Sequence, residues 1–366
     1  MHDYPRLLGD IGGTNARFAI IRRRGGQLEE LRTLSGADYS GPREAIEAYL
    51  EVVGGERPRV GAFGIANPIE GDRINMTNHT WDFSIDELRR QLGWSHALFV
   101  NDFTALALSL PFLPAEELRQ LGGEQRDARR AIAVLGPGTG LGVSGLLPAP
   151  DGSFLPIEGE GGHVTLAAVT AEEAAVIDKA SEIFPHVSAE RLISGPGLVT
   201  LHESLAAIRR LPSPCLDAPG IVAGALEGAD TLAFDSLTMF CAMLGTVAGN
   251  LALTLGAKGG VFIGGGIVPR LGEFFARSPF RRVLRKRGVS KPIWRLFLFL
   301  SFTRLIRPLP ASLWRWKAHY ELEEPLLAAA RTDLDCLIDQ QVPHWRLSAV
   351  IAAVQAPVPK KASRRQ

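Results

Sequence analysis

The fold of this chain is decided by the stretch Leu7-Leu8-Gly9-Asp10-Ile11-Gly12-Gly13-Thr14-Asn15-Ala16-Arg17-Phe18-Ala19-Ile20-Ile21. Its two ends are short and apolar, which predicts a strand, a tight turn and a second strand. Adjacent glycines let the backbone turn tightly and let a ligand reach backbone N–H groups with no Cβ in the way. Such a turn suits a phosphate: Thr14 and Asn15 offer hydrogen bonds, and Asp10 is placed to hold a hydrated Mg²⁺. An ordinary hairpin turn is the alternative.

Two common nucleotide motifs are excluded here. A Walker loop needs Gly-x-x-x-x-Gly-Lys-Ser/Thr, and the stretch contains no lysine. A dinucleotide fingerprint needs Gly-x-Gly-x-x-Gly at the start of a helix, whereas these glycines lead into a second apolar run.

The pattern occurs a second time. Residues 132–147 again place a glycine-rich turn, Gly136-Pro137-Gly138-Thr139-Gly140, between two apolar runs. A third glycine cluster, Gly264-Gly265-Gly266, follows the apolar run 260–263. Two such hairpins and a late glycine cluster predict two related halves that close on one nucleotide.

These three segments resemble the sugar kinase, actin and Hsp70 superfamily, and Asp-Ile-Gly-Gly-Thr-Asn-Ala-Arg is similar to the bacterial glucokinase family. The resemblance covers about residues 6–282. It implies an α/β chain with the two-domain actin-like ATPase (ribonuclease H-like) fold, a cleft between the domains, and ATP and Mg²⁺ as cofactors. Asp10 would hold Mg²⁺ through water, and the last cluster would contact adenosine. The implied nucleotide contacts are Gly9, Asp10, Ile11, Gly12, Gly13, Thr14, Asn15, Gly138, Thr139, Gly140, Gly265 and Gly266.

The composition is that of a soluble globular protein. The 366 residues are 46% hydrophobic and 22% charged, with a net charge of +1. No global field therefore points to nucleic acid or membrane. Cys215, Cys241 and Cys336 are scattered, which fits neither a disulfide framework nor a metal cluster. With no signal-peptide pattern at the N-terminus, a reducing cytoplasm is the expected location.

The segment after the first hairpin alternates helices and strands. A helix is predicted from Pro42, a buried parallel strand over 60–66, and a capped helix over 84–90. This order predicts an α/β domain. Further along, residues 231–255 predict one long helix in which Gly245 and Gly249 allow close packing.

Asn101 and Asp102 stand where an apolar strand stops and a helix begins. Ligands of α/β sheets bind at the carboxyl ends of strands, but an Asp at a helix start can also serve as a cap. The glucokinase resemblance implies that this pair binds the sugar and that Asp102 is the catalytic base.

Three more residues match the family. The resemblance makes Glu160, His163 and Glu190 ligands of sugar hydroxyls. From the residues alone, Glu160 and His163 could be a metal pair, but no third ligand has the right spacing. Glu190 could equally be a solvated residue in the first turn of a helix. If its contact is to the sugar, replacing it by Gln should raise the glucose KM far more than the ATP KM.

The C-terminal part departs from the family. Residues 277–319 are rich in Lys and Arg and contain no Asp or Glu, and 293–300 are apolar but too short to span a bilayer. Legal codons for 288–304, read in another frame, give a string like the family's usual ending, which suggests a frameshift near residue 283. The expected organisation is a small domain over 1–112, a large domain over 113–282, and an atypical tail over 283–366.

The resemblance therefore implies a hexokinase-type enzyme of the glucokinase family, which would phosphorylate the 6-hydroxyl of glucose with ATP in the first step of glycolysis. The expected partners are glucose and ATP, with no nucleic acid and no membrane span, and the resemblance is compatible with a homodimer. A sugar-sensing regulator of the same superfamily and an inactive sugar-binding pseudoenzyme are the alternatives. The regulator is disfavoured because no room precedes the first hairpin for a DNA-binding domain.

Overall fold

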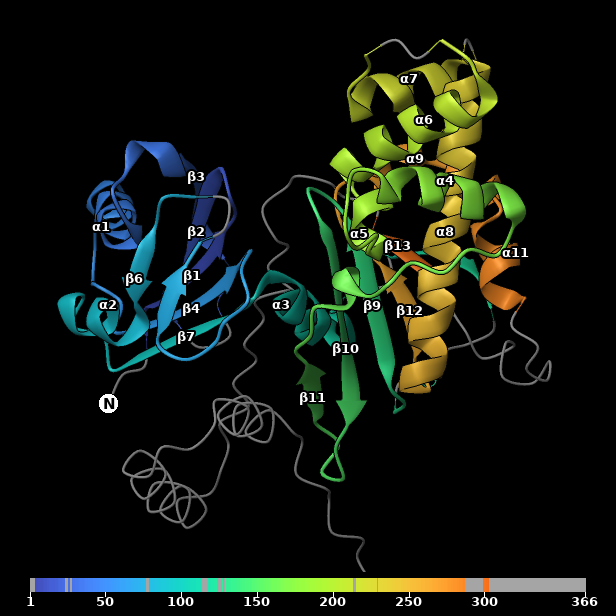
Figure 1. Ribbon diagram of the computed structural model, residues 1–366. Coiled ribbons are helices and arrows are strands. Elements are labelled where there is room, and N and C mark those ends of the chain that lie inside the picture. The colour runs from blue at the N-terminus through green and yellow to red at the C-terminus, as the bar shows by residue number, and fades with distance from the viewer. Residues whose placement is uncertain are drawn as a thin grey trace, which may run out of the picture. The chain divides into compact units, whose positions relative to one another are not determined.

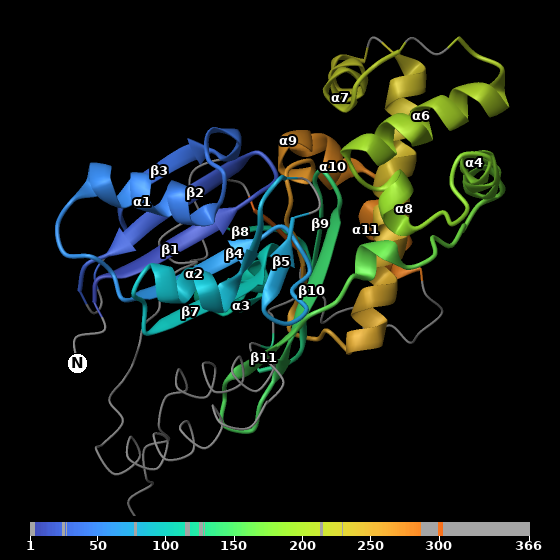
Figure 2. The same cartoon turned by 60° about the vertical axis from the view of Figure 1, so that its left-hand side comes forward.

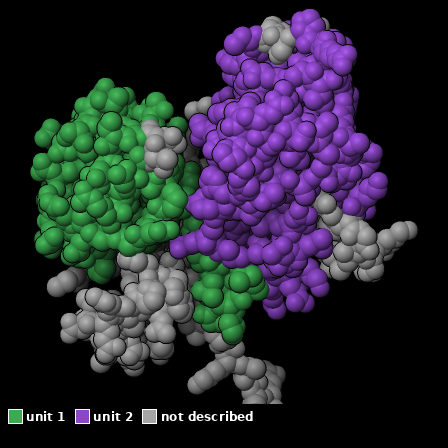
Figure 3. Space-filling view, viewed as in Figure 1, with its two compact units in different colours: residues 1–112, 147–156, 308–366 green, residues 113–146, 157–307 purple. Residues whose placement is uncertain are grey.

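The computed structural model describes residues 4–23, 26, 28–76, 79–113, 118–123, 127, 129–212, 215–228, 230–286 and 299–302. These fall into two compact units, coloured separately in Figure 3. The first takes the described residues of 1–112 and 147–156, and the second takes those of 113–146 and 157–307.

The first unit is built on a five-stranded sheet in the order β3-β2-β1-β4-β7. The strands β1, β2 and β3 form an antiparallel meander, whereas β1, β4 and β7 run parallel. The strand–turn–strand at the N-terminus and the buried parallel strand are thus confirmed. The bounds are β1 (Arg6–Ile11), β2 (Asn15–Ile21), β3 (Glu29–Ser35), β4 (Val60–Ile65) and β7 (His96–Asn101), with a small antiparallel pair β5 (Arg73–Asn75) and β6 (Asp82–Ser84).

Helices α1 (Pro42–Val53) and α2 (Ile85–Gln91) cover one face of this sheet (Figure 2). Tyr49 of α1 is fully buried, and its ring lies 5.5 Å from that of Phe18 on β2. Phe63 of β4 completes this aromatic centre at 6.5 Å from Phe18. Burial of such rings is the main source of stability for a sheet–helix layer. The remaining helical segments are η1 (Gly36–Asp38), α3 (Asp102–Ser109) and η2 (Leu110–Phe112).

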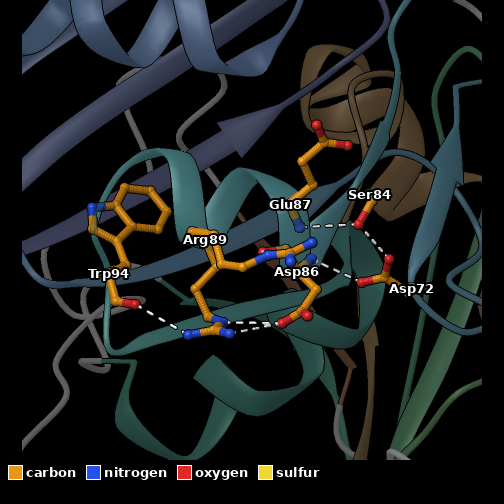
Figure 4. A network of polar contacts seen from close by, with 7 residues as sticks. Asp72, Ser84, Asp86, Glu87, Arg89 and Trp94 are labelled. Atoms are coloured by element: carbon orange, nitrogen blue, oxygen red, sulfur yellow. Dashed lines mark hydrogen bonds and ion pairs between the residues drawn. The ribbon is translucent and has the colours of Figure 1, made fainter.

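The predicted cap at the start of α2 is confirmed and extends into a polar network (Figure 4). The Ser84 hydroxyl accepts the N–H of Glu87 at 3.0 Å and donates to Asp72. Asp72 also accepts the N–H of Asp86 at 2.8 Å, and Arg89 donates to the Asp86 carboxylate at 2.9 Å. The first turn of α2 therefore has acceptors for its otherwise unpaired N–H groups.

The second unit contains a six-stranded sheet in the order β11-β10-β9-β12-β13-β8. β9 and β10 form the predicted second hairpin, and β12, the predicted strand before the last glycine cluster, runs parallel to β9. The sequence did not predict β8, whose residues are mostly partly exposed. The bounds are β8 (Leu118–Gly122), β9 (Ile132–Pro137), β10 (Leu141–Pro148), β11 (Phe154–Ile157), β12 (Gly260–Ile263) and β13 (Phe299–Phe302).

Helix α8 (Thr231–Leu255) is the centre of the helical layer and has the bounds that the sequence predicts. Helices α6, α7 and α11 pack beside it (Figure 1). A Cβ on Gly245 would lie 2.5 Å from the carbonyl oxygen of Phe280 in α11, so a glycine is needed for this close approach. The other helices are η4 (Gly161–His163), α4 (Ala171–Ser181), α5 (Ala189–Leu192), α6 (Gly195–Arg209), α7 (Ala218–Glu227), α9 (Val268–Leu271), α10 (Glu273–Arg277) and α11 (Phe280–Arg285).

Among the described helices, α8 alone is long and apolar enough to cross a membrane. However, 72% of its apolar window is buried within the protein, as in a core helix. Most of the atypical segment 283–366, and with it the frameshift hypothesis, lies outside the described residues. Within that segment the backbone of β13 pairs with β12 and β8.

Candidate active site

The first glycine turn joins β1 to β2 and is held by backbone bonds. The N–H of Gly12 donates to the carbonyl of Asn15 at 2.9 Å, and the N–H of Gly36 donates to that of Thr14 at 2.8 Å. Thr14 is exposed at the tip. Close packing requires a glycine at position 9, because a Cβ there would lie 2.3 Å from the Phe63 ring.

Asp10 faces Arg17 across the hairpin, where the two residues are opposite each other in the β1–β2 register. Arg17 Nη1 donates to Asp10 Oδ2 at 2.7 Å. Burial raises the pKa of Asp10, and the hydrogen bond and charge of Arg17 oppose this rise. A single oxygen-donating carboxylate fits Mg²⁺, which usually keeps several waters and binds through few carboxylates together with substrate phosphates.

Asn101 and Asp102 lie at the same sheet edge as the first glycine turn. In the parallel register Ile11 pairs with Ile65, and Ile65 pairs with Asn101, so β1, β4 and β7 end together. The Asn101 side chain caps α3 by accepting the N–H groups of Phe103 at 2.9 Å and Thr104 at 3.3 Å. Asp102 is half-buried in the first turn, where its Oδ1 accepts the Phe103 N–H at 2.8 Å. The capping position considered for Asp102 is therefore occupied by Asn101.

The second glycine turn lies against the last glycine cluster. The N–H of Gly138 donates to the carbonyl of Gly140 at 2.7 Å. A Cβ on Gly136 would lie 2.4 Å from the carbonyl carbon of Gly264. Gly265 has a φ of +78°, and a Cβ there would lie 2.4 Å from the carbonyl oxygen of Pro137. Two segments far apart in the sequence thus approach so closely that side chains would not fit between them.

The structure also brings Glu160, His163 and Glu190 to the start of β10. Glu160 precedes η4 and His163 is its last residue; Oε2 of Glu160 and Nε2 of His163 are 3.9 Å apart, and both side chains are more than half exposed. η4 packs against α5, which carries Glu190. No group of three His, Cys, Asp or Glu side chains that could hold a metal ion occurs among the described residues.

Sequence reasoning missed two polar contacts of these segments. Arg17 was quoted in the first motif without a role, although opposite charges on facing hairpin positions are a detectable signal. The hydrogen bond from the N–H of Leu141 to Glu190 Oε2, 2.8 Å long, joins residues far apart in sequence and leaves no local pattern.

Solved structures with this architecture show its class. A glucokinase from an Antarctic psychrotroph has a TM-score of 0.75 at 34% identity, covering 83% of this chain and 95% of that chain. A ROK family glucokinase from Streptomyces griseus, solved with glucose and AMPPNP, has a TM-score of 0.51 at 18% identity, covering 81% and 94%. The second likeness is one of fold alone. The protein is thus of the sugar-kinase class with the two-domain actin-like ATPase fold.

Sequence comparison specifies the family. The family model described as Glucokinase matches residues 7–298. The glucokinase of Aromatoleum aromaticum is 55% identical over 286 residues, which are 78% of this chain and 86% of that protein. The chain belongs to the glucokinase family.

Proposed function

We propose that this chain transfers the γ-phosphoryl group of ATP to the 6-hydroxyl of glucose, and that Asp102 accepts the proton of that hydroxyl. The observation that carries the proposal is that the first glycine turn and the Asn101–Asp102 pair lie at the same edge of one sheet. A phosphate-type turn and a carboxylate at one edge suit phosphoryl transfer, which needs positioning and charge neutralisation more than covalent help.

The first unit would act on the transferred group. The N–H groups of the first turn and the hydroxyl of Thr14 would bind phosphate oxygens. Asp10 would hold Mg²⁺ through water, and Arg17 keeps this partly buried carboxylate paired. When bound with ATP, Mg²⁺ supplies neutralisation of the phosphate charge. Asn101 would bind a sugar hydroxyl through its amide while its Oδ1 holds the start of α3 and thereby fixes Asp102.

The second unit would supply further ligands. The turn over 138–140 would bind phosphate and Gly265 with Gly266 would lie along the adenosine. Glu160, His163 and Glu190 would pair with sugar hydroxyls, and a site that pairs several hydroxyls rejects analogues that lack one. A cytoplasmic location and a homodimer complete the proposal on the strength of the family resemblance.

Asp102→Asn tests the proposal. The amide keeps an oxygen for the Phe103 N–H, so folding and glucose binding should be kept, while kcat should fall about 10²- to 10⁴-fold with the loss of a general base. Asp86→Asn is the matched control, because Asp86 also lies in the first turn of a helix in this unit. Retention by Asp102→Asn of more than about a tenth of the wild-type kcat would show that Asp102 is not the base.

A further inference from the structure

Glu190 is bonded to the second glycine turn as well as lying beside the proposed sugar ligands. Its Oε2 accepts the N–H of Leu141, the first residue of β10, at 2.8 Å. The carbonyl of the same residue faces η4, since a Cβ on Gly162 would lie 2.1 Å from it. Both backbone groups of Leu141 therefore face segments that carry proposed sugar ligands.

Besides the bond from the N–H of Ile267 to the carbonyl of Pro137, three described hydrogen bonds hold residues 138–141 at this turn. One is internal, from the N–H of Gly138 to the carbonyl of Gly140. A second comes from the N–H of Gly195 to the carbonyl of Gly138 at 2.7 Å. The third is the bond from the N–H of Leu141 to Glu190 Oε2. Of these three bonds, it alone involves a side chain. A charged acceptor makes it stronger than a bond between neutral groups.

We propose that Glu190 is a positioning residue for the second glycine turn, and that its carboxylate thereby links this phosphate-type turn to the sugar ligands. That Glu190 binds the sugar rests on the function proposed above. That Glu190 positions the turn rests on its hydrogen bond with the N–H of Leu141. The prediction from sequence, that Glu190→Gln raises the glucose KM far more than the ATP KM, stays a prediction. The bond to Leu141 adds that a substitution which removes the acceptor, such as Glu190→Ala, should also weaken nucleotide binding.

A substitution at Gly140, in the turn itself, would also disrupt the hydrogen bond between Leu141 and Glu190. A Cβ at Gly140 would lie 2.5 Å from Glu190 Oε2 and 3.2 Å from its carboxyl carbon, so an alanine would displace the carboxylate. Gly138 lies in the same turn, but the nearest atom to a Cβ there, the nitrogen of Gly266, is at an ordinary contact distance of 3.9 Å. Gly138→Ala is therefore the matched control for Gly140→Ala.

The first experiment measures MgADP binding to the full chain by calorimetry with no glucose present. Glu190→Ala should weaken binding about tenfold or more, because a hydrogen bond to a charged acceptor is lost. Glu190→Gln should lose only a few-fold, since its amide oxygen can still accept from Leu141. Glu160→Ala is the control: it removes another proposed sugar ligand, and no described hydrogen bond joins Glu160 to Leu141. It should therefore leave the affinity for MgADP unchanged.

The second experiment measures glucose binding with no nucleotide present. Gly140→Ala should weaken it several-fold, because its Cβ would displace the Glu190 carboxylate. Gly138→Ala should not, because a Cβ there meets no atom closer than 3.9 Å. If Glu190→Ala binds MgADP as tightly as wild type at an unchanged melting temperature, the positioning role is wrong. If MgADP binding weakens in Glu190→Ala but not in Glu190→Gln, while glucose binds both normally, the positioning role stands and the assignment of Glu190 to the sugar is wrong.

Discussion

Replacing Asn101 separates its structural contribution from its proposed contact with the sugar. Its Oδ1 accepts two N–H groups at the start of α3, at 2.9 and 3.3 Å. Removing an N-cap costs about 1 kcal/mol, with a range of roughly 0.5–2 kcal/mol. For a unit of this size, 1 kcal/mol shifts the melting temperature by roughly 2–8 °C. Asn101→Ala should therefore melt a few degrees below wild type.

Asn101→Asp is the informative partner of that variant. Aspartate caps helices about as well as asparagine, so its melting temperature should stay close to that of wild type. Both variants lose the amide proposed to bind the sugar and should show a raised glucose KM. Thermal denaturation followed by circular dichroism, with glucose KM measured in parallel, separates the two effects. Equal destabilisation of both variants would refute the capping argument, and an unchanged glucose KM in Asn101→Ala would refute the sugar contact.

Three other predictions concern charge, metal and thiol chemistry. Burial raises the pKa of Asp10. The stabilisation that Asp10 gives the folded protein is therefore fully present below its usual pKa of 3.8 and is lost as the pH rises through the raised pKa of the folded state. Asp10→Asn should thus gain melting temperature over wild type as pH rises to neutrality while losing MgATP turnover; a pH-independent difference between the two would contradict this. His163 is predicted to bind sugar, so protein purified without added metal should contain no stoichiometric zinc by atomic emission, and one zinc per chain would overturn that role. Burial raises the pKa of Cys241 to about 12, whereas Cys215 is exposed. When the native protein is treated with a maleimide, peptide mapping should therefore find the label on Cys215 and not on Cys241. Equal labelling of the two would disprove the burial of Cys241.

The elements that the sequence predicted well are those specified by local patterns. Each glycine hairpin has its turn residues between two apolar runs, and α8 has an apolar run from an Asp cap at Asp230 to a left-handed Gly256. Such signals lie within a few residues of the element that they specify. Gly245 was also expected to allow close packing, and it packs against α11.

The features that the sequence did not predict depend on distant partners. β8 has the polar sequence Leu-Arg-Gln-Leu-Gly, and it becomes a strand by pairing with β13. The bond between Glu190 and Leu141 likewise exists only once α5 has packed near β10. For Asn101 and Asp102 the sequence located the strand end but considered only Asp102 as a possible cap. In the structure Asn101 makes the cap, and both residue types are good caps.

The most direct test of the account is formation of glucose 6-phosphate by the purified 366-residue chain. The assay supplies ATP, Mg²⁺ and glucose, couples the product to glucose-6-phosphate dehydrogenase, and compares wild type with Asp102→Asn at matched glucose occupancy. The account predicts turnover by wild type that depends on both ATP and glucose, and a loss of at least about a hundredfold in the variant. Glucose binding by wild type without any product would contradict it and identify the chain as a sugar-binding pseudoenzyme.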